Sequence, residues 1–237
     1  MPSRAVVEVA GRNVVLAFSD RSDGDFAISG EPRALARRRS ALAPHAWTWL
    51  DQVHGAGVVV VSTPGQWAGA RADASVTSVP GAVLAVQTAD CAPVLLWGSG
   101  PGESASPVIA AVHAGWRGLY EGVVEAAVRC MRDLGAVDLH AELGPCIAPE
   151  AYEFSERDLT TMALRFGPDV VGATEQGTAA LDLPAAVRVA LRSAGVLVET
   201  GHWACTATAT AGGEPRYHSH RARVDAGRQA SAIWIEP

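Results

Sequence analysis

No stretch of the 237-residue sequence is apolar over the roughly 18 residues that a membrane-spanning helix needs. The first ten residues, MPSRAVVEVA, lack the apolar centre of a secretory signal. The net charge is −6 and no basic stripe runs along the chain, which argues against a nucleic-acid partner. These absences lead us to expect a cytoplasmic protein that binds neither membranes nor nucleic acids.

Cysteine is scarce, and internal repeats and low-complexity segments are lacking. In a reducing compartment the four cysteines, Cys91, Cys130, Cys146 and Cys205, are expected to be thiols or metal ligands rather than disulfides. With 49% hydrophobic residues the chain can bury one large core, so residues 1–237 are predicted to form a single domain. Two segments containing Gly and Pro, 99–107 and 208–218, are expected to be surface loops.

Strands and helices are both predicted. Runs rich in Val, Ile and Trp predict strands near residues 5–9, 13–18, 57–62, 82–87, 93–97, 107–113, 138–143, 196–199 and 231–235. Apolar residues at helical spacing predict helices at 32–42, 118–134, about 155–165, and 183–195. Several strands are apolar on both faces, which favours an α/β fold with a large mixed β-sheet flanked by helices.

Three apolar stretches contain ionisable residues where only packing is expected. DQVHGAGVVVV contains His54, QTADCAPVLL contains Asp90 and Cys91, and VIAAVHAGWRG contains His113. Two histidines and a cysteine suit zinc, and three protein ligands leave a fourth position open, as in catalytic zinc sites. The separations of 37 and 22 residues match no short zinc motif. The residues alone therefore leave open structural histidines and a packed cysteine.

Two further residues have alternative interpretations. Asp90 either orients a metal ligand and moves a proton, or is a buried carboxylate satisfied by backbone N–H groups. Arg117 opens the helix that follows HAGW, where exposed N–H groups and a guanidinium favour an anion. In the alternative, Trp116 packs and Arg117 covers it.

The C-terminal half contains two weaker signals. Cys146, in LGPCIAPEAYEF, is either a pocket thiol or a packed small residue. His218 and His220 would face the same way on a strand and could bind copper, or they are two solvated histidines.

In their order along the chain, DQVHG, ADASVT…PGAVLAVQTADCAPVLL, VIAAVHAGWRG, LGPCI…YEF and CT…YHSHR…GRQASAIW resemble the YfiH-like family. Its members are called laccase-domain or polyphenol-oxidase proteins, purine nucleoside phosphorylases, or peptidoglycan editing factors. The resemblance runs from about Phe18 to the C-terminus, and the combination of TADC with HAGWRG is highly specific.

The resemblance implies a single YfiH-like domain and a metal, usually zinc with copper as the other possibility, held by His54, Cys91 and His113. It also implies phosphorolysis of adenosine, inosine, guanosine or methylthioadenosine, and adenosine deamination. The partners are then a purine nucleoside and phosphate. Arg117 is the main candidate for binding phosphate, with Arg21 or Arg221 assisting, and Trp116 and the Cys146 turn are candidates for the purine slot.

The sequence departs from the family pattern near its N-terminus. Arg21 matches an arginine of the family's turn, but Asp23 replaces a glycine and the following loop is short. If that loop closes the pocket, the site is more open or its substrate preference differs. Near the C-terminus Ser219 and Arg221 are kept, whereas Ala222 stands where a second arginine is common.

Other functions remain as alternatives. A copper-dependent polyphenol oxidase of the multicopper laccase type needs many His-x-His pairs, and this chain has seven histidines and one such pair. A hydrolase that edits peptidoglycan precursors would use the same metal, or Cys91 as a nucleophile. A non-catalytic metal-binding protein is the third alternative.

Overall fold

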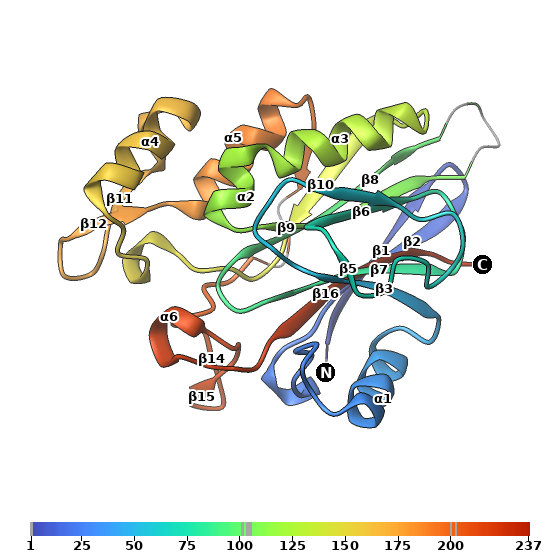
Figure 1. Ribbon diagram of the computed structural model, residues 1–237, viewed down its shortest axis with the longest axis horizontal. Coiled ribbons are helices and arrows are strands. Elements are labelled where there is room, and N and C mark those ends of the chain that lie inside the picture. Colours follow the sequence, from blue (N-terminus) through green and yellow to red (C-terminus); the bar gives the residue numbers. More distant parts are fainter. Residues whose placement is uncertain (1, 101, 103–105, 200, 202) are drawn as a thin grey trace.

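Two six-stranded sheets lie face to face at the centre of the protein (Figure 1). The computed structural model describes residues 2–100, 102, 106–199, 201 and 203–237. The first sheet contains, in order across it, β1 (Ser3–Val9), β2 (Arg12–Phe18), β16 (Gln229–Ile235), β7 (Ala82–Thr88), β3 (Ala46–Asp51) and β5 (Ala70–Arg71). The second contains β13 (Leu197–Glu199), β10 (Val137–Leu143), β8 (Ala92–Ser99), β9 (Val108–Ala114), β6 (Ala74–Thr77) and β4 (Val58–Val60).

Helices cover the outer faces of both sheets (Figure 1). The first sheet is covered by α1 (Pro32–Leu42), and the second by α2 (Trp116–Glu121), α3 (Val123–Asp133) and α5 (Leu183–Ser193). Beside α5 lie α4 (Glu156–Phe166) and the hairpin of β11 (Val171–Ala173) and β12 (Ala179–Leu181). The remaining short elements are α6 (His220–Arg223), the hairpin of β14 (Thr210–Ala211) and β15 (Glu214–Pro215), and the 3-10 turns Arg21–Asp23, Pro149–Ala151 and Pro168–Val170.

The most apolar strands occupy the interior because both of their faces are covered. All seven residues of β7 and all seven of β9 are buried. Leu84 and Val86 of the first sheet pack in one cluster with Leu95 and Ile109 of the second. Burying apolar surface between two sheets contributes about 25 cal/mol per Å², so this layer is a main source of stability.

The α/β class is confirmed, and the predicted strands are divided between two sheets. β7 and β8 form the apolar stretch around Asp90, but they belong to different sheets because the chain turns sharply there. The sequence pattern did not predict β3 or β6. The sequence of β3 is polar and aromatic, and that of β6 is short and partly polar. Within the described residues, no helix is long and apolar enough to span a membrane.

The prediction of one helix over 118–134 is wrong. The helical pattern is interrupted at Gly122, whose φ of 92° lies in the left-handed region, so α2 ends and α3 begins there. Gly135, also left-handed, follows the end of α3. The predicted loop 208–218 contains the β14–β15 hairpin. In the predicted loop 99–107, residues 101 and 103–105 lie outside the described residues.

Candidate metal centre

Three segments pass from the first sheet to the second, and two of them carry candidate ligands. The segment between β3 and β4 carries His54, and the segment between β7 and β8 carries Asp90 and Cys91. His54 has a φ of 61° and Asp90 a φ of 98°, values that are uncommon for residues with a side chain. Such backbone strain costs on the order of 1–3 kcal/mol and persists where surrounding contacts hold it.

His54, Cys91 and His113 form one cluster. His113 comes from β9 and is buried, Cys91 is partly exposed and His54 is exposed. Their ligand atoms all lie within 4.8 Å of one another, and Cys91 Sγ is 3.8 Å from His54 Nε2. Among the residues that the structure describes, this cluster is the one group of three or more His, Cys, Asp or Glu side chains whose ligand atoms lie close enough together to hold a metal.

Asp73 organises this cluster, although the sequence pattern did not identify it. Its buried carboxylate is 2.8 Å from His113 Nδ1 through Oδ1, which leaves Nε2 of that ring for a metal. The same carboxylate accepts hydrogen bonds from the backbone N–H groups of His54 at 2.9 Å, Gly55 at 2.8 Å and Val53 at 3.3 Å. It therefore orients one ligand and shapes the loop that carries another. In the sequence, Asp73 is only an isolated aspartate ahead of a short strand. Many aspartates with a purely structural role occur in the same position, so this pattern does not identify a functional residue.

The residues present fit a metal. A side chain at Gly115 would bring a Cβ to 2.8 Å from His54 Cδ2 and 3.1 Å from Cys91 Sγ. Glycine therefore keeps open the space beside the two ligands, at the point where β9 leads into α2. Two imidazoles and a thiolate are a donor set that zinc prefers, and that copper also accepts.

Electrostatics within the cluster favour the ligating form of Cys91. Burial raises the pKa of the Cys91 thiol, but His113 and His54 outweigh that effect and lower its pKa to about 6. Burial lowers the pKa of His113, but Cys91 and Asp73 outweigh it and raise that pKa to about 9. Both shifts favour a thiolate beside an imidazolium, and a bound metal would displace the proton of His113.

Asp90 is held by three contacts. Its Oδ1 accepts from Thr206 Oγ1 at 2.7 Å, its Oδ2 accepts from the backbone N–H of Arg221 at 2.6 Å, and its carbonyl accepts from the N–H of Ile147 at 2.9 Å. The carboxylate thus ties the turn before Cys91 to two C-terminal segments. It also lies on the wall of the cavity described next, so its contacts are compatible with both interpretations made from the sequence.

A cavity of about 500 Å³ opens beside the cluster, and His54, Cys91 and His113 form part of its wall. The loop 27–29 contributes to the same wall, so the short N-terminal segment does border the cavity. Among its other polar lining residues are Gln87, Thr88, Tyr152, His220, Arg221 and Arg228.

Of the predicted substrate-binding residues, Arg221 lines the cavity. Its Nη1 donates to the Glu153 carbonyl at 2.7 Å, and its guanidinium lies 4.9 Å from the ring centre of Tyr152. Tyr152 was not identified from the sequence, because nothing distinguishes it from the neighbouring aromatic residue Phe154 there. Burial and the nearby Cys91 raise the pKa of Tyr152, so its hydroxyl stays protonated as a hydrogen-bond donor.

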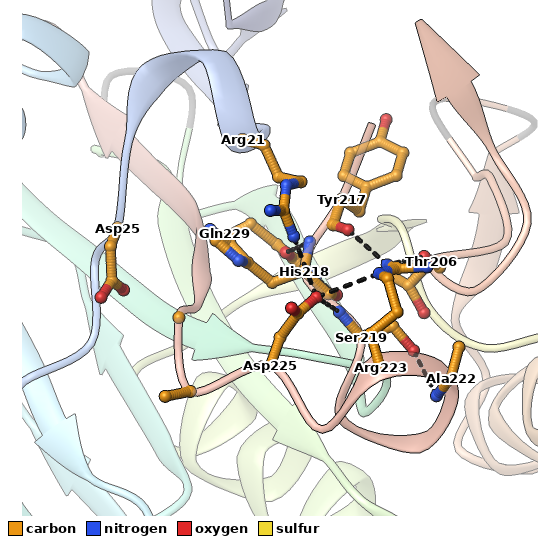
Figure 2. A network of polar contacts seen from close by, with 12 residues as sticks. Arg21, Asp25, Thr206, Tyr217, His218, Ser219, Ala222, Arg223, Asp225 and Gln229 are labelled. Atoms are coloured by element: carbon orange, nitrogen blue, oxygen red, sulfur yellow. Dashed lines mark hydrogen bonds and ion pairs between the residues drawn. The ribbon is translucent and has the colours of Figure 1, made fainter. Parts of the chain in front are cut away.

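Arg21 and Ser219 are bound in a separate polar network (Figure 2). Asp225 Oδ2 accepts from Arg21 Nη1 at 3.0 Å, from Ser219 N at 2.9 Å and from Arg223 Nε at 3.2 Å. Ser219 Oγ accepts from Ala222 N at 3.1 Å and caps α6. Neither Arg21 nor Ser219 is among the described residues that line the cavity, and both support the segment that carries Arg221.

Arg117, Trp116 and Cys146 are likewise absent from the cavity lining within the described chain. The Arg117 guanidinium lies 4.7 Å from the Trp116 ring centre, and Trp116 meets Phe154 edge to face at 5.3 Å. Cys146 is fully buried, and its sulfur accepts from Trp203 Nε1 at 3.2 Å. Burial raises the pKa of Cys146, which keeps it a thiol.

Several proteins of known sequence are similar to this chain. A protein named purine nucleoside phosphorylase from Streptomyces coelicolor is 38% identical over 207 residues, covering 86% of this chain and 81% of that protein. One of the same name from Pseudomonas aeruginosa is 34% identical, covering 98% and 93%. The purine nucleoside phosphorylase YfiH of Escherichia coli is 37% identical, covering 81% and 75%.

The fold has been seen before, and the sequence matches a family. Protein NMB0706 of Neisseria meningitidis superposes with a TM-score of 0.79 at 25% identity, covering 99% of both chains. YlmD of Geobacillus stearothermophilus superposes with a TM-score of 0.73 at 24% identity, covering 96% and 93%. The family described as multi-copper polyphenol oxidoreductase laccase matches residues 15–236. The chain therefore belongs to this laccase-like family, which includes the YfiH proteins.

Proposed function

We propose that this protein is a zinc-dependent purine nucleoside phosphorylase. The observation that carries the proposal is the His54–Cys91–His113 cluster in the wall of a cavity of about 500 Å³. A cavity of that volume is in the range used for small-molecule ligands. The relatives named purine nucleoside phosphorylase support the choice of a nucleoside and phosphate as substrates.

In phosphorolysis a phosphate oxygen forms a bond to C1′ of the nucleoside while the bond from C1′ to the base nitrogen breaks. The products are ribose 1-phosphate and the free base, which takes up a proton. Positive charge is needed where the phosphate binds, and a guanidinium can bind two phosphate oxygens at once. Arg221 is the residue we assign to this task, since it lines the cavity and its contacts with Glu153 and Tyr152 limit its motion.

His54, Cys91 and His113 would hold the metal, with Asp73 orienting His113. A metal in such a site supplies a Lewis acid and lowers the pKa of a bound water to about 7. Asp90 is assigned to positioning, because it ties the Cys91 turn to the backbone of Arg221. Arg117, Arg21, Trp116, Cys146 and Ser219 are assigned indirect roles, since the described cavity lining does not include them.

Adenosine deamination is a second reaction that we propose for the same cavity. It requires C6 of the base near the metal, whereas phosphorolysis requires C1′ beside the phosphate. The two reactions therefore need different placements of one nucleoside, and their products differ. Deamination consumes water and yields inosine and ammonia whether or not phosphate is present, and phosphorolysis yields a free base only with phosphate.

The test is to incubate zinc-loaded protein with adenosine, inosine, guanosine and methylthioadenosine, with and without phosphate, and to separate the products by chromatography. Metal content is measured by plasma emission. We expect one zinc per chain and phosphate-dependent release of free base. Several copper ions per chain with oxidation of phenols would instead indicate a polyphenol oxidase, and no turnover with metal bound would indicate a binding protein.

Substitution of His113 by Ala is expected to abolish metal binding and to reduce turnover at least about a hundredfold, because it removes a ligand and takes from the buried Asp73 carboxylate its imidazole partner. Cys91→Ser, which keeps the shape of the side chain, should do the same. His45→Ala, outside the cavity, is the matched control. Full activity of either metal-free variant would contradict the metal mechanism, and activity that survives a chelator but is lost in Cys91→Ser would favour Cys91 as a nucleophile.

A further inference from the structure

Gln87 differs from the other buried or partly buried glutamines of the described chain. The carboxamides of Gln52 and Gln229 each form two hydrogen bonds with the backbone, and that of Gln66 accepts from Ser62. Gln87 is only 7% exposed, yet neither its Oε1 nor its Nε2 has a hydrogen-bond partner among the described residues. It lies on the wall of the cavity that contains the metal cluster.

A buried amide without a partner lowers the stability of the folded protein, so it needs an explanation. A carboxamide can bond simultaneously through an oxygen acceptor and an N–H donor that lie side by side. The hydroxyl of the next residue, Thr88, is also buried without a partner and lines the same cavity. Unsatisfied polar groups in two residues that line one cavity point to a polar ligand rather than to a defect in packing.

The backbone of Gln87 is held in place while its side chain is free. Gln52 Nε2 donates to the Gln87 carbonyl at 2.8 Å, and the Gln87 N–H donates to Gln52 Oε1 at 2.8 Å. Gln52 is two residues before His54, and Gln87 is four residues before Cys91. The segments that lead into His54 and Cys91 are therefore joined by hydrogen bonds at this point, and the backbone of Gln87 has a defined place relative to the cluster.

We propose that the Gln87 carboxamide binds the 6-substituted edge of the purine base. This inference rests on the proposed function. Adenine presents an N6 donor beside a ring-nitrogen acceptor, while hypoxanthine and guanine present an O6 acceptor beside the N1 donor. A carboxamide pairs with adenine in one orientation and with a 6-oxopurine after rotation about its last torsion. One residue thus accounts for a site that takes both 6-amino and 6-oxo nucleosides.

The test compares wild-type protein with Gln87→Met, which keeps an unbranched side chain and removes both polar atoms. Adenosine, inosine and purine riboside, whose base has no 6-substituent, are the substrates. We expect KM for adenosine and inosine to rise about tenfold, because each loses two hydrogen bonds to the base. For purine riboside we expect a rise of about threefold or less, and KM for phosphate should not change. Gln176→Met, on an exposed turn, is the control.

Thermal unfolding separates binding from a structural role. If Gln87 serves a ligand, Gln87→Met should have a Tm equal to or a few degrees above that of the wild type, whereas Gln52→Met should lower Tm. A lower Tm for Gln87→Met would overturn the inference, as would equal losses for all three nucleosides. With an active wild type, either result leaves the proposed function standing. A wild type that turns over no nucleoside overturns the proposed function and this inference together.

Discussion

At the scale of single residues, Asp73 determines most of the local geometry of the metal cluster. One carboxylate contacts the imidazole of His113 and three successive N–H groups of the loop around His54. Burial raises the pKa of Asp73, but the hydrogen bonds from His113 and Gly55 outweigh it and lower that pKa below its usual value. Asp73 is therefore an anion whose two oxygens only accept hydrogen bonds. An asparagine amide cannot reproduce this, because one of its two polar atoms is a donor.

Asp73→Asn should weaken zinc binding about 10- to 100-fold and lower the free energy of unfolding by about 1–3 kcal/mol. The amide places a donor where backbone N–H groups need an acceptor, and it no longer stabilises His113 as a ligand. Competition with a chromophoric chelator measures the affinity, and urea unfolding measures stability. Asp133→Asn, at an exposed aspartate, is the control. Unchanged zinc affinity in Asp73→Asn would show that His113 is oriented without it.

At the scale of elements, the break between α2 and α3 lets the two consecutive helices pack in different places. α3 packs on the second sheet, whereas α2 follows its N-cap residue, Gly115, which lies beside the candidate ligands. A Cβ at Gly118 would come within 2.8 Å of the Gly55 carbonyl, so α2 and the His54 loop are in close contact. The left-handed backbone of Gly122 ends α2 and lets α3 continue in a different direction.

Gly122→Ala should destabilise the protein by about 1–2 kcal/mol, because the alanine must adopt a φ of about 92° that its Cβ disfavours. Urea unfolding gives the difference. Gly57→Ala, at a glycine with ordinary φ and only ordinary contacts, is the control and should change stability by less than about 0.5 kcal/mol. If the two alanines had the same effect, the break would not depend on left-handed backbone.

At the scale of the whole molecule, the candidate metal cluster lies where the chain crosses between the two sheets. His54 and Cys91 lie on segments that pass from the first sheet to the second, and His113 lies in the second. An ion bound by all three stabilises the folded state only, because the unfolded chain does not hold the ligands together.

Removing the metal with a chelator should therefore lower Tm by about 5–10 °C, the effect expected for free zinc at about a hundred times its Kd. Differential scanning calorimetry of the wild type with and without chelator measures the shift. His113→Ala should unfold at the same temperature in both conditions. A shift of the same size in that variant would mean that the chelator acts elsewhere.

Much of the fold was predictable where apolar runs are long, as in β7 and β9, because a fully buried strand needs side chains that are apolar on both faces. The three candidate metal ligands were predicted through the family resemblance, and the structure brings them together. Asp73, Tyr152 and Gln87 were not identified, because a single polar residue has no signal until its neighbours in space are known.

The sequence by itself determined the α/β class, because hydrophobic periodicity is a local property. It also identified His54, Cys91 and His113 as candidate metal ligands, by their side-chain chemistry together with the family resemblance. Tertiary structure alone decided that the turn at Asp90 passes between two sheets, that Asp73 supports His113, and that Arg221 faces the cavity while Arg117 does not. These depend on contacts between residues far apart along the chain, such as Thr206 with Asp90, which form only when the two sheets pack.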